Sequence, residues 1–205
     1  PAIAMAQEVQ SPNGNVRLRF SLTGNGVPTY EMTYKNKAVV KPSHLGLELA
    51  KDKHASKSMN ETSLMDGFTI IDTKTSSFDE TWRPVWGETS TIRNNYTELA
   101  VNLAQPATKR NIIVRFRVYD YGMGLRYEFP QQDSLTYFVI KDEHTQFAMA
   151  GDHTAWWLPG DYDTQEQKTQ ESRLSEIRSR FHDAVNWNNS PVAVFSPTSV
   201  QTALQ

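Results

Sequence analysis

Residues 110–119 constrain the fold more than any other stretch of this chain. They read RNIIVRFRVY, in which apolar and polar side chains alternate. This period of two is typical of a strand with one buried face. Residues 120–124 then include two glycines, and residues 125–129 return as a second alternating run. The pair predicts an antiparallel hairpin, because so short a connection cannot form a parallel crossover.

Short runs of the same kind recur along most of the chain, separated by residues that favour turns. They predict roughly ten strands and therefore an all-β antiparallel sandwich. Asn36 predicts a tight turn, and the polar residues 51–63 predict an exposed loop. The predicted strands cover residues 16–22, 28–34, 38–40, 45–49, 68–71, 96–103, 110–119, 125–129, 137–140 and 146–149.

Residues 78–88 form an aromatic segment with two interpretations. Trp82 and Trp86 flank Pro84, which excludes a regular central strand. The first interpretation is a loop that covers the core with its tryptophans. The second is a rim on which sugar rings stack.

Only one amphipathic helix is predicted, near the C-terminal end. Leu174, Ile177, Phe181 and Val185 lie three or four residues apart, which places them on one helix face. We expect Thr169 or Ser172 to cap its start. A last strand begins near residue 199 and meets no turn before the sequence ends, so we expect a fragment of a longer domain.

Composition excludes several classes of function. The 205 residues carry a net charge of −2, which gives no basic surface for nucleic acid. The absence of cysteine excludes disulfides and thiolate zinc sites, and the five histidines lack zinc-ligand spacing. The sequence contains no run of about 18 apolar residues, so no membrane span is predicted. Ala4 and Ala6 match a signal-peptidase site, so residues 1–6 are predicted to be a signal-peptide remnant or a tag.

The stretch that follows Pro159 and Gly160 is acidic. Asp161, Asp163 and Glu166 fall within six residues. Carboxylates this close together repel one another unless a cation neutralises them. The spacing does not match an EF-hand, which requires a glycine and a glutamate at fixed later positions. A solvated acidic turn and a calcium ligand both remain open from spacing alone.

Several longer strings resemble the amino-terminal domain of glycoside hydrolase family 97. They cover much of the chain from about Gln7 onward, in order and with conserved spacing between them. The strings are PTYEMTYKNK at 28–37, FDETWRPVWGE at 78–88, GLRYEFPQQ at 124–132, GDYDTQE at 160–166 and RLSEIR at 173–178. The likeness is greatest to the periplasmic α-glucosidases of bacterial starch-utilisation systems.

The resemblance implies a β-supersandwich similar to that of galactose mutarotase, spanning residues 7–205 and packed on a C-terminal catalytic (β/α)8 barrel. It implies an active-site calcium ion held mostly by barrel glutamates, with Glu166 as the ligand from this domain. The family has two branches that differ in the stereochemical outcome of hydrolysis. The α-glucosidase branch inverts the configuration of the anomeric carbon, and the α-galactosidase branch retains it. No catalytic residue is expected within this chain, which alone should be inactive.

We therefore expect the amino-terminal domain of an exported, periplasmic, calcium-dependent and exo-acting α-glucosidase that acts on α-glucoside oligosaccharides. The alternative is a free-standing carbohydrate-binding sandwich that stacks sugars on its tryptophans. Candidates for substrate binding are Trp156, Trp157, Asp161 and Asp163.

Overall fold

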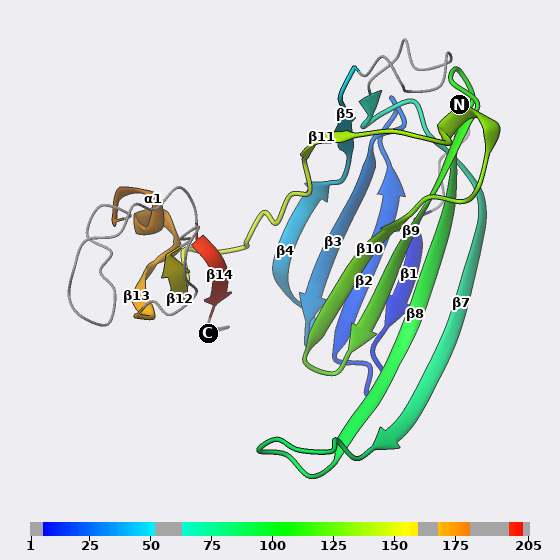
Figure 1. The fold of residues 1–205 in the computed structure, drawn as a ribbon. Helices are drawn as coiled ribbons and strands as arrows, with labels where there is room; N and C mark the ends of the chain where they lie inside the picture. Colours follow the sequence, from blue (N-terminus) through cyan, green and yellow to red (C-terminus); the bar gives the residue numbers. More distant parts are fainter. Residues whose placement is uncertain (1–5, 52–62, 160–167, 181–196, 203–205) are drawn as a thin grey trace. The chain divides into compact units, whose positions relative to one another are not determined.

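The chain folds into two compact units of antiparallel strands. The computed structural model describes residues 6–51, 63–159, 168–180 and 197–202 (Figure 1). The larger unit ends at Ala148 and the smaller begins at Met149. The predicted all-β class with one short helix near the C-terminal end is confirmed. Among the described residues, no helix has the length and apolar character to cross a membrane.

The first sheet of the larger unit is a meander in the order β1-β2-β3-β4. Lys35 and Asn36 both have positive φ, 47° and 64°, which is the backbone of a two-residue hairpin turn. The turn predicted at Asn36 is therefore confirmed. The strands are β1 (Gln7–Gln10), β2 (Val16–Leu22), β3 (Pro28–Tyr34) and β4 (Lys37–His44).

The second sheet has the order β10-β9-β8-β7 and includes a long hairpin. The strands are β7 (Thr69–Trp82), β8 (Ile92–Gln105), β9 (Arg110–Tyr119) and β10 (Gly122–Glu128). In β9 every second residue is buried, as the alternation predicted. The two sheets face each other (Figure 1), and the ring centroid of Phe116 lies 5.9 Å from Phe20 and 5.8 Å from Tyr30.

The structure of residues 78–88 differs from the predicted loop that covers the core. Strand β7 continues to Trp82, and Pro84 lies beyond its end, where the missing N–H removes no ladder bond. The interpretation of these tryptophans as a cover for the core is wrong, because Trp86 is 87% exposed and Trp82 is also accessible. Among the described strands, β7 is at the edge of its sheet and pairs with β8, and its last residues up to Trp82 are exposed.

A third, small sheet has the order β11-β5-β6. Its strands are β5 (Leu47–Leu49), β6 (Ser63–Leu64) and β11 (Ile140–Glu143), and the 3-10 helix η1 (Asp133–Leu135) precedes β11 in the chain. The strand predicted at 137–140 therefore begins only at Ile140. Residues 146–149 were predicted as a strand but form none beyond a single bridge at Met149. The reason is that side chains replace ladder partners: the Ala148 N–H donates to Ser43 Oγ at 2.9 Å.

The smaller unit contains the sheet β13-β12-β14 and a short helix. Its elements are β12 (Thr154–Pro159), β13 (Gln170–Arg173), the 3-10 helix η2 (Leu174–Glu176), α1 (Ile177–Arg180) and β14 (Pro197–Thr202). Neither Thr169 nor Ser172 caps the helical segment. Instead Asp152 reaches it from outside, and its Oδ1 accepts from the Ser175 N–H at 2.9 Å. Phe181 and Val185 lie outside the described residues.

Candidate functional site

In the sequence, the predicted acidic site falls between two strands of the smaller unit, β12 and β13. Asp161, Asp163 and Glu166 fall outside the described residues, so their predicted roles stay predictions. The strands on either side are described: β12 pairs with β13 antiparallel, with Trp157 opposite Gln170. The acidic stretch is thus the connection of a hairpin whose base the structure defines.

The two tryptophans before this connection have different environments. Trp157 is 1% exposed and packs with Ala155 and Ile177 in the core of the smaller unit. Its Nε1 donates to Ser172 Oγ on β13 at 3.1 Å, a bond that spans the hairpin. Trp156 is 38% exposed, because successive strand residues point to opposite faces. Trp157 therefore holds the hairpin register, and Trp156 has the accessible ring; substrate binding by either stays a prediction.

Asp152 connects the start of the hairpin to the helical segment. Its carboxylate accepts hydrogen bonds from both the backbone N–H and the hydroxyl of Ser175, each at 2.9 Å. The bond from the Ser175 backbone N–H lowers the pKa of Asp152 most, and the bond from the Ser175 hydroxyl lowers it further. Arg173 Nη1 donates to the Asp152 carbonyl at 3.0 Å. The segment before β12 and the segment after β13 are therefore held together at the open end of the hairpin, away from the acidic connection.

The donor chemistry of this region fits calcium. Within the described ranges, no three His, Asp or Glu side chains lie close enough together to hold a metal ion. The acidic connection offers carboxylate oxygens, which are the ligands calcium prefers. A calcium ion takes about six to eight oxygens, so this connection can supply only part of a shell.

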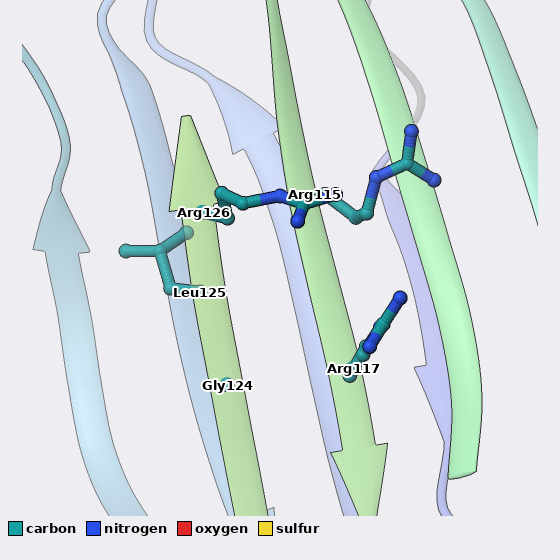
Figure 2. Close-up of a pocket in the computed structure, with 5 residues that line it drawn as sticks. All are labelled: Arg115, Arg117, Gly124, Leu125 and Arg126. Atoms are coloured by element: carbon teal, nitrogen blue, oxygen red, sulfur yellow. The ribbon is translucent and has the colours of Figure 1, made fainter. Parts of the chain in front are cut away.

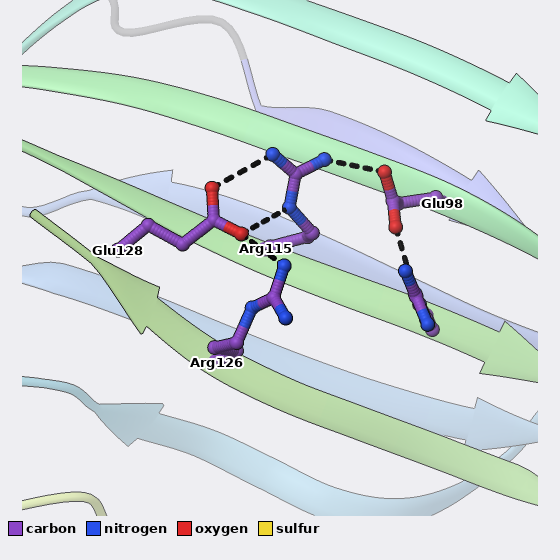
Figure 3. A network of polar contacts seen from close by, with 5 residues as sticks. Glu98, Arg115, Arg126 and Glu128 are labelled. Atoms are coloured by element: carbon purple, nitrogen blue, oxygen red, sulfur yellow. Dashed lines mark hydrogen bonds and ion pairs between the residues drawn. The ribbon is translucent and has the colours of Figure 1, made fainter. Parts of the chain in front are cut away.

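A second cluster lies on the outer face of the second sheet, opposite the core. Arg115 is its centre: Nε and Nη2 donate to the two oxygens of Glu128, both at 2.8 Å, and Nη1 donates to Glu98 (Figure 3). Arg117 Nε donates to the other oxygen of Glu98 at 2.8 Å. Arg126 also pairs with Glu128. We call these five residues the arginine–glutamate network.

The electrostatics of the network favour the charged form of every member with a resolved shift. The hydrogen bonds from Arg115 lower the pKa of Glu128 to about 2, although burial opposes this. Burial alone would raise the pKa of Glu98, but the bonds from Arg117 and Arg115 outweigh it and the pKa falls. Three arginines face two glutamates, which leaves one positive charge in excess.

The network borders a shallow hollow of about 140 Å³ (Figure 2). Gly124 lies opposite Arg117 on the neighbouring strand, and a Cβ atom there would meet nothing within 4 Å. No motif in the sequence pointed to this site. Arginines at 115 and 117, and Arg126 with Glu128, are two residues apart on strands, which was the available signal for a shared face.

Comparison with known proteins gives a family and its solved structures. The family described as Glycosyl-hydrolase 97 N-terminal matches residues 9–204. A glycoside hydrolase family 97 enzyme variant from Pseudoalteromonas sp. strain K8, solved with panose, is 32% identical at a TM-score of 0.71, covering 87% of this chain and 25% of that one. The family 97 enzyme of that strain solved with acarbose gives the same values.

A β-arabinopyranosidase shares the fold at a TM-score of 0.64 and 20% identity, covering 76% of this chain and 23% of that one. The chain thus spans about a quarter of the length of the solved enzymes it matches.

Proposed function

The chain belongs to glycoside hydrolase family 97 as its N-terminal domain, and from this premise we propose that the full-length protein is a calcium-dependent, exo-acting α-glucosidase. The observation that carries the proposal is the 32% identity to an enzyme solved with panose, an oligosaccharide of α-linked glucose. The structure with acarbose supports the same class of ligand. The Ala4 and Ala6 pattern supports export to the periplasm.

In this proposal Glu166 contributes one carboxylate oxygen ligand to a calcium ion in the active site. The hairpin β12–β13 supports the role, because the hydrogen bond from Trp157 Nε1 to Ser172 Oγ joins the two strands that flank the acidic connection. When bound, calcium would supply positive charge near the sugar where the oxocarbenium-like transition state forms. Asp161 and Asp163 add negative charge to the same stretch of sequence. Trp156 presents a partly accessible ring for a sugar.

Glycosidic cleavage needs a pair of carboxyl groups across the scissile bond, one of them an acid. We assign both to the part of the full-length protein beyond this domain. The chain's own contribution is to position a ligand and to border the substrate, so the 205 residues alone should not hydrolyse α-glucosides.

The test is Glu166→Gln in the full-length protein, with Glu171→Gln as the matched control. Glu171 is an exposed carboxylate on β13, in the same hairpin. Loss of one ligand should raise the calcium concentration for half-maximal hydrolysis of panose by at least about tenfold. The melting temperature in calcium-free buffer should be unchanged. Normal calcium dependence in Glu166→Gln would refute the assignment.

A free-standing carbohydrate-binding module remains the second candidate, because Trp82 and Trp86 are exposed. Titration of the 205-residue chain with maltose or panose, followed by tryptophan fluorescence, separates the two. A saturable change would favour the binding module. An unchanged spectrum would leave the hydrolase domain as the function.

A further inference from the structure

A hollow of about 490 Å³ lies on the outer surface of the first sheet, where β4 ends. Thr29 on β3 and His44 on β4 are register partners that line it. Tyr30, which follows Thr29, is buried in the core, so Thr29 points to the opposite, outer side. Asp66 and Gln146 line the hollow from two other segments of the larger unit. We call the hollow lined by Thr29, His44, Asp66 and Gln146 the β4 hollow. Its volume is within the range of small-molecule sites, about 300–1,000 Å³.

Hydrogen bonds hold the segments around the β4 hollow together. The Gln146 N–H donates to the His44 carbonyl at 3.0 Å, and the His44 N–H donates back to Gln146 Oε1 at 3.2 Å. On another side, the Gly67 N–H donates to the Asn25 carbonyl at 2.9 Å, which joins the segment after β6 to the β2–β3 turn. The hollow is therefore formed before any ligand enters, and a ligand that binds there loses little free energy in ordering the protein.

The polar side chains of the hollow have unused hydrogen-bonding capacity. Asp66 accepts one long bond, from Ser63 Oγ to its Oδ1 at 3.4 Å, and Oδ2 accepts none from the described residues. Within the same part of the chain, Gln146 Nε2 and the ring nitrogens of His44 also have no hydrogen-bond partner. The hollow thus offers carboxylate acceptors, amide donors and an imidazole that can donate or accept.

The floor of the hollow is apolar. Val27, Leu45 and Met65 line it, and Leu45 is 1% exposed. An apolar surface with a few polar groups around it is typical of a small-molecule site. A sugar ring has the complementary arrangement, because its C–H groups form an apolar face and its hydroxyls surround the edge.

The charges of the lining disfavour ionic ligands. Among the described residues that line the hollow there is no lysine or arginine, so an anion would meet the carboxylate of Asp66 without a cationic partner. A cation would meet one exposed carboxylate, and exposed ion pairs contribute little. Since no Phe, Tyr or Trp is among these lining residues, a cation also lacks a ring face. A neutral ligand rich in hydroxyl groups matches the lining best.

We propose that the β4 hollow binds a neutral saccharide of one or two rings. Sugar hydroxyls donate to Asp66 and accept from Gln146, and a C–H face of the ring lies on Leu45 and Met65. Because the hollow is open and supplies no large aromatic ring, the dissociation constant should be on the order of 1 mM. The inference rests on the proposed function only in the choice of an α-glucoside as the saccharide to test.

Methionine methyl NMR of the 205-residue chain tests this directly. Met65 lines the hollow, and Met123 on β10 in the other sheet is the internal reference. Maltose should shift the Met65 methyl signal, assigned with Met65→Leu, with half-saturation on the order of 1 mM. The Met123 signal should not move. A Met65 signal that stays in place at about ten times this maltose concentration would overturn the proposal.

A pair of variants tests the carboxylate. Asp66 and Asp72 are both exposed, but Asp72 lies on β7 and is not among the residues that line the hollow. Asp66→Asn should weaken maltose binding at least about fivefold, because an ionised acceptor forms stronger hydrogen bonds than a neutral amide. Asp72→Asn should bind maltose as the wild type does. Equal affinity of the two variants would contradict the role of Asp66.

Control ligands identify other occupants. Phosphate, tetramethylammonium and the acyclic polyol mannitol should leave the Met65 signal unchanged at the concentrations used for maltose. A shift with phosphate would assign the hollow to anions, a shift with tetramethylammonium would assign it to cations, and an equal shift with mannitol would show no preference for a sugar ring. Each of these results overturns the proposal.

Two further measurements separate this site from the functions proposed above. No tryptophan is among the described lining residues, so binding here should leave tryptophan fluorescence unchanged, unlike binding on Trp82 or Trp86. Panose hydrolysis by the full-length protein tests the glucosidase independently. An active enzyme whose 205-residue chain shows no Met65 shift refutes this site alone, and an inactive protein whose chain shows the shift refutes the glucosidase alone.

Discussion

At the scale of single residues, Arg115 shows how a sheet surface acquires an ordered charge network. Its planar guanidinium reaches two carboxylates on the two neighbouring strands, Glu98 on β8 and Glu128 on β10. A bidentate arginine pair fixes orientation as well as charge. The pair is less exposed than the ion pairs on the face of β1–β4, so solvent screens it less.

Glu128 gives a pH dependence with a defined sign. Its pKa falls from 4.5 to about 2 in the folded protein, so its contribution to stability is complete above the ordinary pKa and is lost as the pH falls toward 2. Glu128→Gln should destabilise the 205-residue chain by about 2 kcal/mol at pH 7. The difference from wild type should shrink between about pH 4.5 and pH 2.

Urea unfolding across this pH range measures the effect. Glu31→Gln is the control, because its pair with Arg19 is exposed and contributes less than about 1 kcal/mol. A Glu128→Gln difference that stays constant down to pH 2 would show that the network does not stabilise the folded state through its charge.

At the scale of elements, the turn between β2 and β3 joins the first sheet to the start of β7. Gly26 has a φ of +72°, and its N–H donates to the Thr23 carbonyl at 2.8 Å. Its own carbonyl accepts from the Phe68 N–H at 3.1 Å, so the turn packs on another backbone. A Cβ on Gly26 would lie 2.5 Å from both the N and O atoms of Phe68.

Gly26→Ala should therefore destabilise the chain strongly, by about 3 kcal/mol, through backbone strain and a clash with atoms that cannot rotate away. Gly24, two residues earlier in the same turn, is the matched control. A Cβ on Gly24 meets nothing within 4 Å, so Gly24→Ala should change the unfolding free energy by less than about 0.5 kcal/mol. Equal effects of the two substitutions in urea unfolding would contradict this account of the turn.

At the scale of the whole molecule, the chain corresponds to one part of the solved family 97 enzymes. It spans about a quarter of the solved family 97 structures it matches. The two compact units each have a core, that of the larger between two sheets and that of the smaller around Trp157. What the described part lacks is a complete set of metal ligands.

Calcium affinity should reflect this division. In calorimetric titrations the 205-residue chain should bind calcium at least about 100-fold more weakly than the full-length protein, because one connection cannot provide six to eight oxygens. Magnesium, which requires a tighter octahedral shell, serves as the control ion. Equal calcium affinity of the two proteins would place the whole site within this chain and refute the shared metal centre.

Features that depend on neighbouring residues could be predicted from the sequence alone. Alternation in residues 110–119 predicted a strand with one buried face, and Asn36 predicted a turn, because both signals are local. The strings shared with family 97 predicted the family, which the comparisons confirm. The calcium role of Glu166 and the periplasmic location stay proposals.

Which faces of a strand are buried, in contrast, depends on tertiary packing. The sequence gives Trp156 and Trp157 equal chemistry, but the sheet and helix of the smaller unit bury Trp157 alone. It also gave no reason for β7 to continue to Trp82, or for Ser43 to replace a ladder partner near Ala148. The periodicity of the sequence indicates that a strand has two faces. The elements that pack on each face come from distant parts of the chain, and they determine which face is buried.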